Sequence, residues 1–216
     1  MKVNTDGVLL GAWTDVDEAA SILDIGTGTG VIALMMAQRN TAAIIDAIDI
    51  DESAFRQASE NFLNSPWCDR LYAHHVSLQE YFTEKKYDLI ISNPPYFIDD
   101  YKTESDQKNI AKHSVSLSYQ ELISGIARLL ADNGVASIIL PLFNFDLFRS
   151  LASEKKLFIT RLTEVIAVEG KPPYLVLIKL SRQELNYSKN TLIIQNESGS
   201  FTDEYKSLTK DFYLKF

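Results

Sequence analysis

Short apolar runs alternate along the chain with longer segments in which apolar residues recur every three or four positions. The short runs are typical of buried strands, and the longer segments are typical of helices that pack one face on a core. Strands are predicted at residues 21–25, 44–50, 71–76, 88–91, 135–140, 158–168 and 174–180. Helices are predicted at residues 31–37, directly after Asp51, and at 119–130, 143–156 and 202–213. A short helix capped by Thr5 or Asp6, with Leu9, Leu10 and Trp13 on one face, is expected near the start.

This order of elements predicts an α/β fold with a doubly wound, mostly parallel sheet of seven strands. A turn with one glycine and two prolines joins strands 158–168 and 174–180, so we expect an antiparallel hairpin at the edge of the sheet. We see no repeat and no linker, and we expect a single domain over residues 1–216. Residues 1–20 are its N-terminal helical segment, and residues 183–216 are a C-terminal extension of strand and helix.

Composition narrows the class of protein. With 216 residues, of which 46% are hydrophobic, the chain can bury a full core. No apolar run reaches the roughly 18 residues of a membrane span and no signal-peptide pattern opens the chain, so we expect no membrane association. Cys68 is the only cysteine, which excludes an internal disulfide and favours the cytoplasm. Neither Cys68 nor the three histidines have the spacing of a zinc site, and we expect no metal.

The net charge of −8 argues against a nucleic-acid partner for the molecule as a whole. The charge is uneven, however, because residues 1–100 hold 6 Lys and Arg against 16 Asp and Glu, whereas residues 101–182 hold 11 against 8. A local basic rim that includes Lys102, Lys108, Lys112 and His113 is one interpretation of this excess, and ordinary surface lysines are the other.

A glycine-rich loop follows the first predicted strand. The sequence Asp24-Ile25-Gly26-Thr27-Gly28-Thr29-Gly30 leads directly into the helix at 31–37. Glycines let a ligand approach the backbone and a helix start offers free N–H groups, so this arrangement favours a nucleotide-type ligand. The spacing departs from the dinucleotide-binding pattern, because Val31 displaces its third glycine. The loop alone is therefore a weak signal.

Further candidate residues follow the next two strands. Asp49 lies 23 residues after Gly26, close to the spacing expected of an acid that binds a ribose diol, and Ile50 follows it. Ser77 and Leu78 follow the third strand, where the base of such a ligand would lie. Because the carboxyl ends of parallel strands meet at one edge of a sheet, we expect these residues and the glycine loop to lie together.

The strand at 88–91 runs into Asn93-Pro94-Pro95-Tyr96. Prolines cannot donate to a β-ladder and hold the preceding residue extended, so the segment is a stiff turn at a strand end. It combines an amide, a backbone carbonyl and an aromatic ring, which are the groups needed to hold a planar nitrogen for methylation. Considered alone, it is equally compatible with a strand that simply ends in prolines, with Tyr96 in a loop.

Together, Asp24 to Gly30, Asp49 and Asn93-Pro94-Pro95-Tyr96 resemble the class I S-adenosylmethionine-dependent methyltransferases that act on planar nitrogens and have a Rossmann-like fold. The segments 1–13 and 205–214 narrow the resemblance to the bacterial tRNA1(Val) adenine-37 N6-methyltransferase family. The resemblance implies methylation of an adenine N6 in the anticodon loop of a tRNA, with S-adenosyl-L-homocysteine as the second product. We also expect a monomer.

The resemblance also implies roles for individual residues. Cofactor binding is expected at Thr5, Asp24, Gly26, Thr27, Gly28, Gly30, Asp49, Ile50, Ser77, Leu78 and Asn93. The Asn93 side chain and the Pro94 carbonyl would hold the amino group, with Pro95 stiffening the turn and Tyr96 stacking on the base. The basic residues Lys102, Lys108, Lys112 and His113 would contact RNA.

Two departures from the family pattern stand out. Relatives usually carry an extra segment before the stretch at 2–6, so Met1 could be an internal start. Many have an acidic residue where Ser77 stands, which predicts weaker cofactor affinity here because a neutral hydrogen bond is weaker than a charged one.

Three alternatives remain. Protein glutamine methyltransferases share the Asn-Pro-Pro-Tyr motif but carry a separate N-terminal helical domain. Another adenine-N6 or guanine-N2 nucleic-acid methyltransferase would use the same core. An inactive RNA-binding relative would keep the fold without the reaction, although the intact Asp24, Asp49 and Asn93 speak against this.

Overall fold

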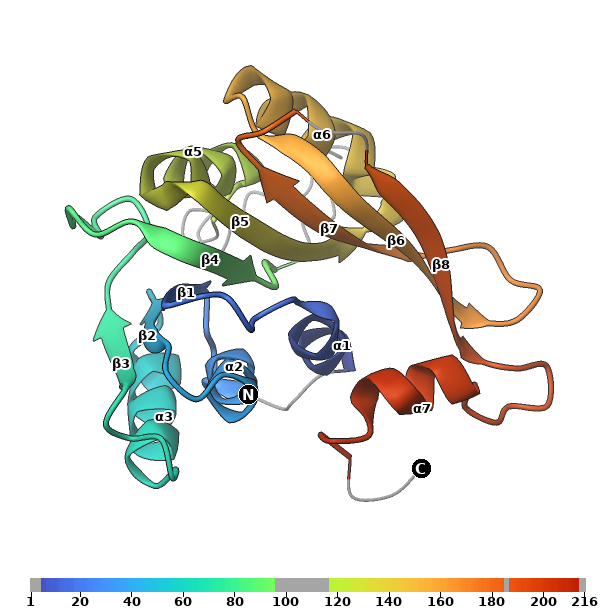
Figure 1. Ribbon diagram of the computed structural model, residues 1–216, viewed down its shortest axis with the longest axis horizontal. Coiled ribbons are helices and arrows are strands. Elements are labelled where there is room, and N and C mark those ends of the chain that lie inside the picture. The colour runs from blue at the N-terminus through green and yellow to red at the C-terminus, as the bar shows by residue number, and fades with distance from the viewer. Residues whose placement is uncertain (1–4, 96–116, 185–186, 214–216) are drawn as a thin grey trace, which may run out of the picture.

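The computed structural model describes residues 5–95, 117–184 and 187–213. In this part of the chain, eight strands form one twisted sheet in the order β3-β2-β1-β4-β5-β7-β6-β8 (Figure 1). The strands are β1 (Ser21–Ile25), β2 (Ile44–Asp49), β3 (Leu71–His75), β4 (Tyr87–Ser92), β5 (Leu130–Pro141), β6 (Phe158–Val168), β7 (Leu175–Ser181) and β8 (Ser188–Gln195). The helices are α1 (Thr5–Trp13), α2 (Val31–Arg39), α3 (Glu52–Leu63), α5 (Tyr119–Leu129), η1 (Leu142–Asn144), α6 (Phe145–Glu154) and α7 (Asp203–Thr209).

The sheet is parallel from β3 to β5 and mixed beyond it. β7 pairs antiparallel with both β5 and β6. The predicted α/β class and mostly parallel sheet are therefore confirmed, and so is the β6–β7 hairpin. The hairpin does not lie at the edge, however, because β8 pairs in parallel with β6 and adds an eighth strand to the predicted seven. This strand belongs to the predicted C-terminal extension, and a lone strand gives no local indication of its partner.

The junction of α5 and β5 differs from the predicted helix at 119–130 and strand at 135–140, which leave Asn133 and Gly134 between the two elements. The helix ends at Leu129, and the strand begins at Leu130 and includes both residues. A side chain on Gly134 would place its Cβ 2.7 Å from the Tyr87 carbonyl oxygen. The glycine therefore permits a close approach between strands β4 and β5, and it does not mark a turn.

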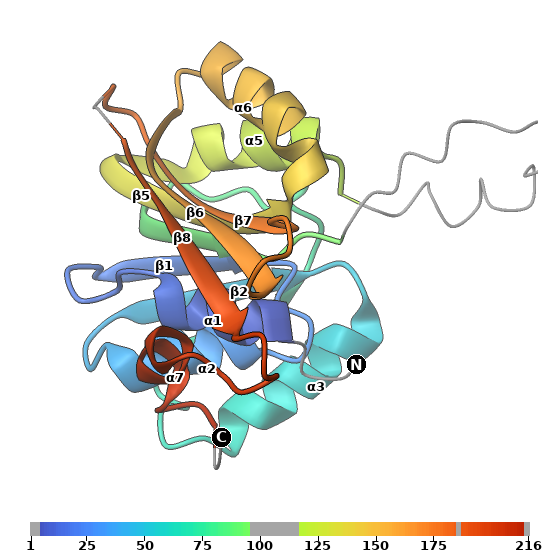
Figure 2. The same cartoon turned by 90° about the vertical axis from the view of Figure 1, so that its right-hand side faces the viewer.

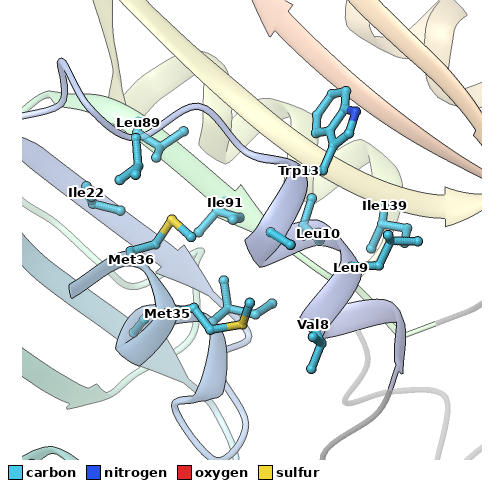
Figure 3. Packing of buried hydrophobic residues seen from close by; sticks show 14 of the residues in the cluster. Val8, Leu9, Leu10, Trp13, Ile22, Met35, Met36, Leu89, Ile91 and Ile139 are labelled. Atoms are coloured by element: carbon cyan, nitrogen blue, oxygen red, sulfur yellow. The ribbon is translucent and has the colours of Figure 1, made fainter. Parts of the chain in front are cut away.

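Helices cover both faces of the sheet, as Figures 1 and 2 show. One face packs against α1, α2, α3 and α7, and the other packs against α5 and α6. Strand alternation divides the side chains between the two cores, so that Ile22 faces the first and Leu23 faces the second. Figure 3 shows the first core, where Leu9 of α1 lies beside Ile139 of β5 and Met36 of α2 lies beside Ile91 of β4.

The N-terminal helix α1 is anchored in this core. Every residue from Gly7 to Trp13 is buried, and Thr5 and Asp6 lie in the first turn of the helix rather than before it. The indole Nε1 of Trp13 donates to Thr163 Oγ1 of β6 at 2.9 Å. The Arg161 guanidinium lies 4.3 Å from the centre of the indole ring. The carboxyl end of α1 is thereby held at one position relative to the sheet.

We expect Trp13→Phe to lower the free energy of unfolding by about 1 to 2 kcal/mol, because Thr163 loses a buried donor while most apolar contact is kept. Urea denaturation would measure the loss. Adding Thr163→Val should cost less in the Trp13→Phe background than in the wild-type protein, because the two groups interact. Equal costs in both backgrounds would contradict this account of the contact.

Candidate active site

A cavity of about 740 Å³ opens at the carboxyl ends of β1, β2 and β4. Its wall combines the glycine loop after β1, the end of β2, the start of α3, the segment after β3 and the turn after β4. This volume is within the range of small-molecule sites. The segments that sequence reasoning placed at one edge of the sheet therefore share one cavity.

The glycine loop is shaped by backbone that only glycine adopts easily. Gly26, Gly28 and Gly30 have φ angles of +70°, +59° and +82°. The N–H groups of Gly26 and Thr27 both donate to the Ile48 carbonyl of β2, at 2.9 and 3.1 Å. Gly26 and Thr27 line the cavity, whereas Gly28 and Gly30 are not among its lining residues and instead set the course of the loop.

Asp24 is fully buried at the end of β1. Thr27 donates its hydroxyl to Asp24 Oδ2 at 2.6 Å, whereas Oδ1 is buried and has no hydrogen-bond partner in the described part of the chain. Burial raises the pKa of Asp24 to about 7, and the Thr27 hydrogen bond opposes this rise. Asp24 itself is not among the cavity-lining residues, whereas Gly26 and Thr27, which follow it closely in the chain, are. A carboxylate that is buried without a countercharge favours a cationic group on the ligand.

Asp49 connects the glycine loop to α3. Its Oδ2 accepts the Gly28 N–H at 2.8 Å, and its Oδ1 accepts the Asp51 N–H at 2.9 Å. Asp51 in turn accepts the Ala54 N–H at 2.8 Å, as expected of the residue that caps α3. Each carboxylate oxygen of Asp49 can accept a further bond, and both Asp49 and Ile50 line the cavity. The side chain can therefore accept from a pair of ligand hydroxyls.

The segment after β3 forms another wall of the cavity, through Ser77, Leu78 and Gln79. The Ser77 hydroxyl donates to Glu80 Oε2 at 2.9 Å. Ser77 stands where many relatives have an acidic residue, and here the acidic side chain of Glu80 lies next to it. The Arg128 guanidinium of α5 donates to the Leu78 and Tyr81 carbonyls at 2.7 and 2.8 Å. This wall is therefore fixed from behind by α5.

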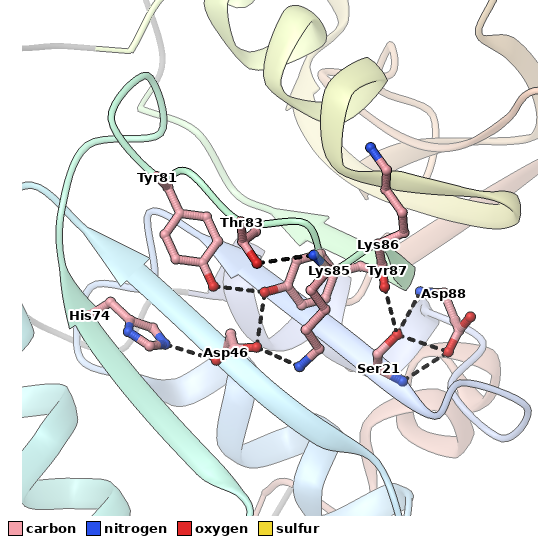
Figure 4. Close-up of polar contacts among 9 residues, drawn as sticks. All are labelled: Ser21, Asp46, His74, Tyr81, Thr83, Lys85, Lys86, Tyr87 and Asp88. Atoms are coloured by element: carbon pink, nitrogen blue, oxygen red, sulfur yellow. Dashed lines mark hydrogen bonds and ion pairs between the residues drawn. The ribbon is translucent and has the colours of Figure 1, made fainter.

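A polar network secures the other end of the same segment (Figure 4). Asp46 of β2 accepts hydrogen bonds from Lys85 Nζ at 2.7 Å and Tyr87 OH at 2.9 Å, and it also pairs with His74 at 2.8 Å. Although its burial opposes ionisation, these three partners lower the pKa of Asp46 to about 2. Asp46 lies within β2 and is not among the cavity-lining residues, so its role is to hold the segment in place.

The turn after β4 completes the cavity with Asn93, Pro94 and Pro95. The Ser92 hydroxyl donates to the Ile25 carbonyl of β1 at 2.8 Å, which joins the turn to the residue before the glycine loop. Asn93 is half-buried, Pro94 is buried and Pro95 is exposed. The turn is therefore a wall of the same cavity that the glycine loop lines.

Some predicted residues are not tested by this geometry. Thr5 is exposed at the start of α1 and is not among the cavity-lining residues, although Gly7 of the same helix is. The predicted stacking residue and the predicted RNA contacts lie outside the described residues, namely Tyr96, Lys102, Lys108, Lys112 and His113.

Several lining residues were not predicted. Ser53 and Gln57 lie on α3 one turn apart, and Leu117 precedes α5. Polar residues at this spacing resemble a solvated helix face, so only the neighbouring Asp49 could have pointed to them. Gln79 follows the predicted Ser77 and Leu78, and extending that pair by one residue would have included it.

In the described part of the chain, no cluster of three or more His, Cys, Asp or Glu side chains is arranged to hold a metal ion. None of the described helices has the length and apolar character needed to cross a membrane.

Comparison with solved structures supports the fold. A predicted O-methyltransferase of Agrobacterium tumefaciens superimposes with a TM-score of 0.75 over 95% of this chain and 96% of its own, at 16% identity. An O-methyltransferase of Brevibacillus brevis, solved in complex with S-adenosyl-L-homocysteine, superimposes with a TM-score of 0.56 over 81% of this chain and 70% of its own, at 12% identity. At these identities the likeness concerns the fold alone.

Comparison of sequences is more specific. Residues 6–139 match the family model of the methyltransferase small domain. The tRNA1(Val) (adenine(37)-N6)-methyltransferase of Flavobacterium psychrophilum is 45% identical, over 100% of this chain and 93% of its own. The protein of the same name from Bacteroides fragilis is 44% identical, over 100% of this chain and 92% of its own. The chain therefore belongs to the family of the tRNA1(Val) (adenine(37)-N6)-methyltransferases.

Proposed function

We propose that this protein transfers a methyl group from S-adenosyl-L-methionine to the N6 atom of adenine 37 in the anticodon loop of tRNA1(Val). The observation that carries the proposal is that a single cavity is lined by the glycine loop, by Asp49 and by the Asn93-Pro94-Pro95 turn. One wall suits an adenosine-containing cofactor, and another suits a planar amino group. The family relationship supports both the reaction and the substrate. We expect the protein to act in the cytoplasm, where its substrate is made.

The residues present fit the cofactor. Asp24 would attract the ammonium of its methionine part, and Asp49 would accept the two ribose hydroxyls. The backbone of Ser77 and Leu78 would border its adenine. When bound, the cofactor supplies an electrophilic methyl group on a positively charged sulfur.

The chain's own contribution to the chemistry is to hold and polarise the acceptor. The lone pair of an adenine amino group is delocalised into the ring, which makes N6 a poor nucleophile. The Asn93 side-chain oxygen and the Pro94 carbonyl would accept the two N6 hydrogens and favour a pyramidal nitrogen. Positive charge develops on N6 as the new N–C bond forms, so these acceptors bind the transition state more tightly than the ground state. The surplus proton then leaves N6 to water, and no strong base is needed.

The target base must leave its stack to enter the cavity. An adenine in a single-stranded loop does so at a lower energetic cost than one in a duplex. Asn93, Pro94 and Pro95 are positioned by the end of β4, and their stiffness keeps the acceptor groups in place. Orientation of the two reactants within one cavity then accounts for most of the rate acceleration.

The direct test is transfer of a labelled methyl group into total tRNA, followed by nucleoside analysis. We expect labelled N6-methyladenosine from the wild-type protein and a reduction of about 100-fold or more in kcat for Asn93→Ala, because an acceptor that acts in the transition state is lost. Asn133→Ala is a suitable control, since Asn133 is exposed at the amino end of β5. Label in protein alone, or an unchanged rate for Asn93→Ala, would refute the proposal.

Asp24→Asn should weaken cofactor binding by about tenfold or more, measured by calorimetry, because an ionic partner is removed.

The pH dependence of the free energy of unfolding provides a second test of Asp24. The raised pKa means that folded Asp24 keeps a proton that the unfolded chain releases above about pH 4, so wild-type stability falls as pH rises toward 7. The stability of Asp24→Asn relative to the wild type should therefore increase from pH 4 to pH 8.

Asp88→Asn provides a contrast, because Asp88 Oδ2 accepts from the Ala20 N–H, the Ser21 N–H and the Ser21 hydroxyl. This variant should lose stability at neutral pH and keep its cofactor affinity. A relative stability of Asp24→Asn that stays constant across the pH range would show that Asp24 does not carry the shifted proton.

A further inference from the structure

Three large apolar side chains are exposed in the segments that follow β5 and precede β7 at the carboxyl edge of the sheet. Phe143 is 70% exposed, Leu147 is 49% exposed and Tyr174 is 41% exposed. Phe143 and Leu147 are four residues apart in the continuous helical segment formed by η1 and α6, so they share a face. The Leu142 N–H, next to Phe143, donates to the Tyr174 carbonyl at 2.9 Å. We call these three residues the apolar rim.

Strand pairing places the apolar rim on the same edge of the sheet as the Asn93 turn. Ser92 of β4 is paired with Ile138 of β5, and Pro141, at the end of β5, is paired with Leu175 of β7. Neighbouring strands are about 4.8 Å apart and a strand rises about 3.3 Å per residue, so Tyr174 lies roughly 10 Å from Asn93 across the sheet and about 10 Å further along it. A few nucleotides of a single strand span that separation.

Tyr174 also lies near the first turn of α1. Burial of the ring raises the pKa of Tyr174, and the charge of Asp6 raises it further. Asp6 is adjacent to Gly7, which lines the cavity. Tyr174 is therefore within electrostatic range of a residue next to this part of the cavity wall.

The charge of the protein makes apolar contacts to RNA valuable. With a net charge of −8, the molecule as a whole repels phosphates, and attraction by scattered cations is reduced. Stacking of bases on aromatic rings does not depend on the net charge of the protein. A single-stranded loop presents such bases next to the one that enters the cavity.

We propose that the apolar rim binds the nucleobases next to the target adenine, with Phe143 and Tyr174 as stacking surfaces and Leu147 as apolar support. The inference rests on the proposed function, because it takes the substrate to be a single-stranded tRNA loop. It adds a second binding site outside the cavity, which holds the strand while the target base is inserted.

The test uses the full-length protein and an anticodon stem-loop that contains the target adenine. Phe143→Leu and Tyr174→Leu should each raise KM for the stem-loop by about fivefold or more, with kcat and cofactor affinity little changed. Phe143→Tyr and Tyr174→Phe keep a ring and should retain most of the binding. Phe82→Leu and Tyr187→Leu are matched controls, because Phe82 and Tyr187 are 82% and 50% exposed in segments that lead to the amino ends of β4 and β8.

An abasic nucleotide placed on either side of the target should raise KM for the wild-type protein and have a smaller effect on the rim variants. KM values equal to those of the controls would overturn the inference while leaving the proposed function intact. A wild-type protein that does not methylate adenine in tRNA would instead overturn the proposed function. Sedimentation tests whether a second copy of the chain, and not RNA, covers the rim. A wild-type dimer that becomes monomeric in Phe143→Leu would assign the rim to that second copy and overturn the inference.

Discussion

The relative position of β1 and β4 is the constraint on which the site depends. The two strands are paired in parallel from Ile22 and Leu89 to Ile25 and Ser92, and the Ser92 hydroxyl closes the pairing on the Ile25 carbonyl at 2.8 Å. The next residue on one strand is Gly26, and on the other it is Asn93. A shift by one residue would turn every side chain to the opposite face. The glycine-loop wall and the Asn93 wall of the cavity are therefore positioned by the same ladder of backbone hydrogen bonds.

The buried acids near this ladder show two different uses of a carboxylate. Asp46 has three partners and a pKa lowered to about 2, so its charge is stabilised and it serves to hold a segment. Asp24 has one partner, an unbonded oxygen and a pKa raised to about 7. A buried group left partly unsatisfied destabilises the protein unless a ligand completes it. This contrast is the structural basis of our proposal that Asp24, and not Asp46, binds the cofactor.

The sequence was sufficient for the parts of the molecule that local patterns determine. The glycine loop, Asp49 and the Asn93 turn were placed correctly, because strand ends in a parallel sheet converge without knowledge of the packing. The role of Asp51 as a helix cap could also be inferred, since capping involves residues three positions apart. The pairing of β8 and the function of Gly134 could not, because both depend on a neighbour far away in the chain.

The same limit explains why the wall after β3 was predicted only in part. Ser77 and Leu78 follow a strand, but what holds them is α5, roughly fifty residues later, as the Arg128–Leu78 hydrogen bond shows. A side chain on Gly125 would place its Cβ 2.5 Å from Leu78 Cδ2, so the helix packs directly on the segment that lines the cavity. Arg128 donates to carbonyl groups that would otherwise lack a partner within the segment. Helix α5 therefore supports the cavity wall formed by the segment after β3, and its close contact with Leu78 requires a residue without a side chain at position 125.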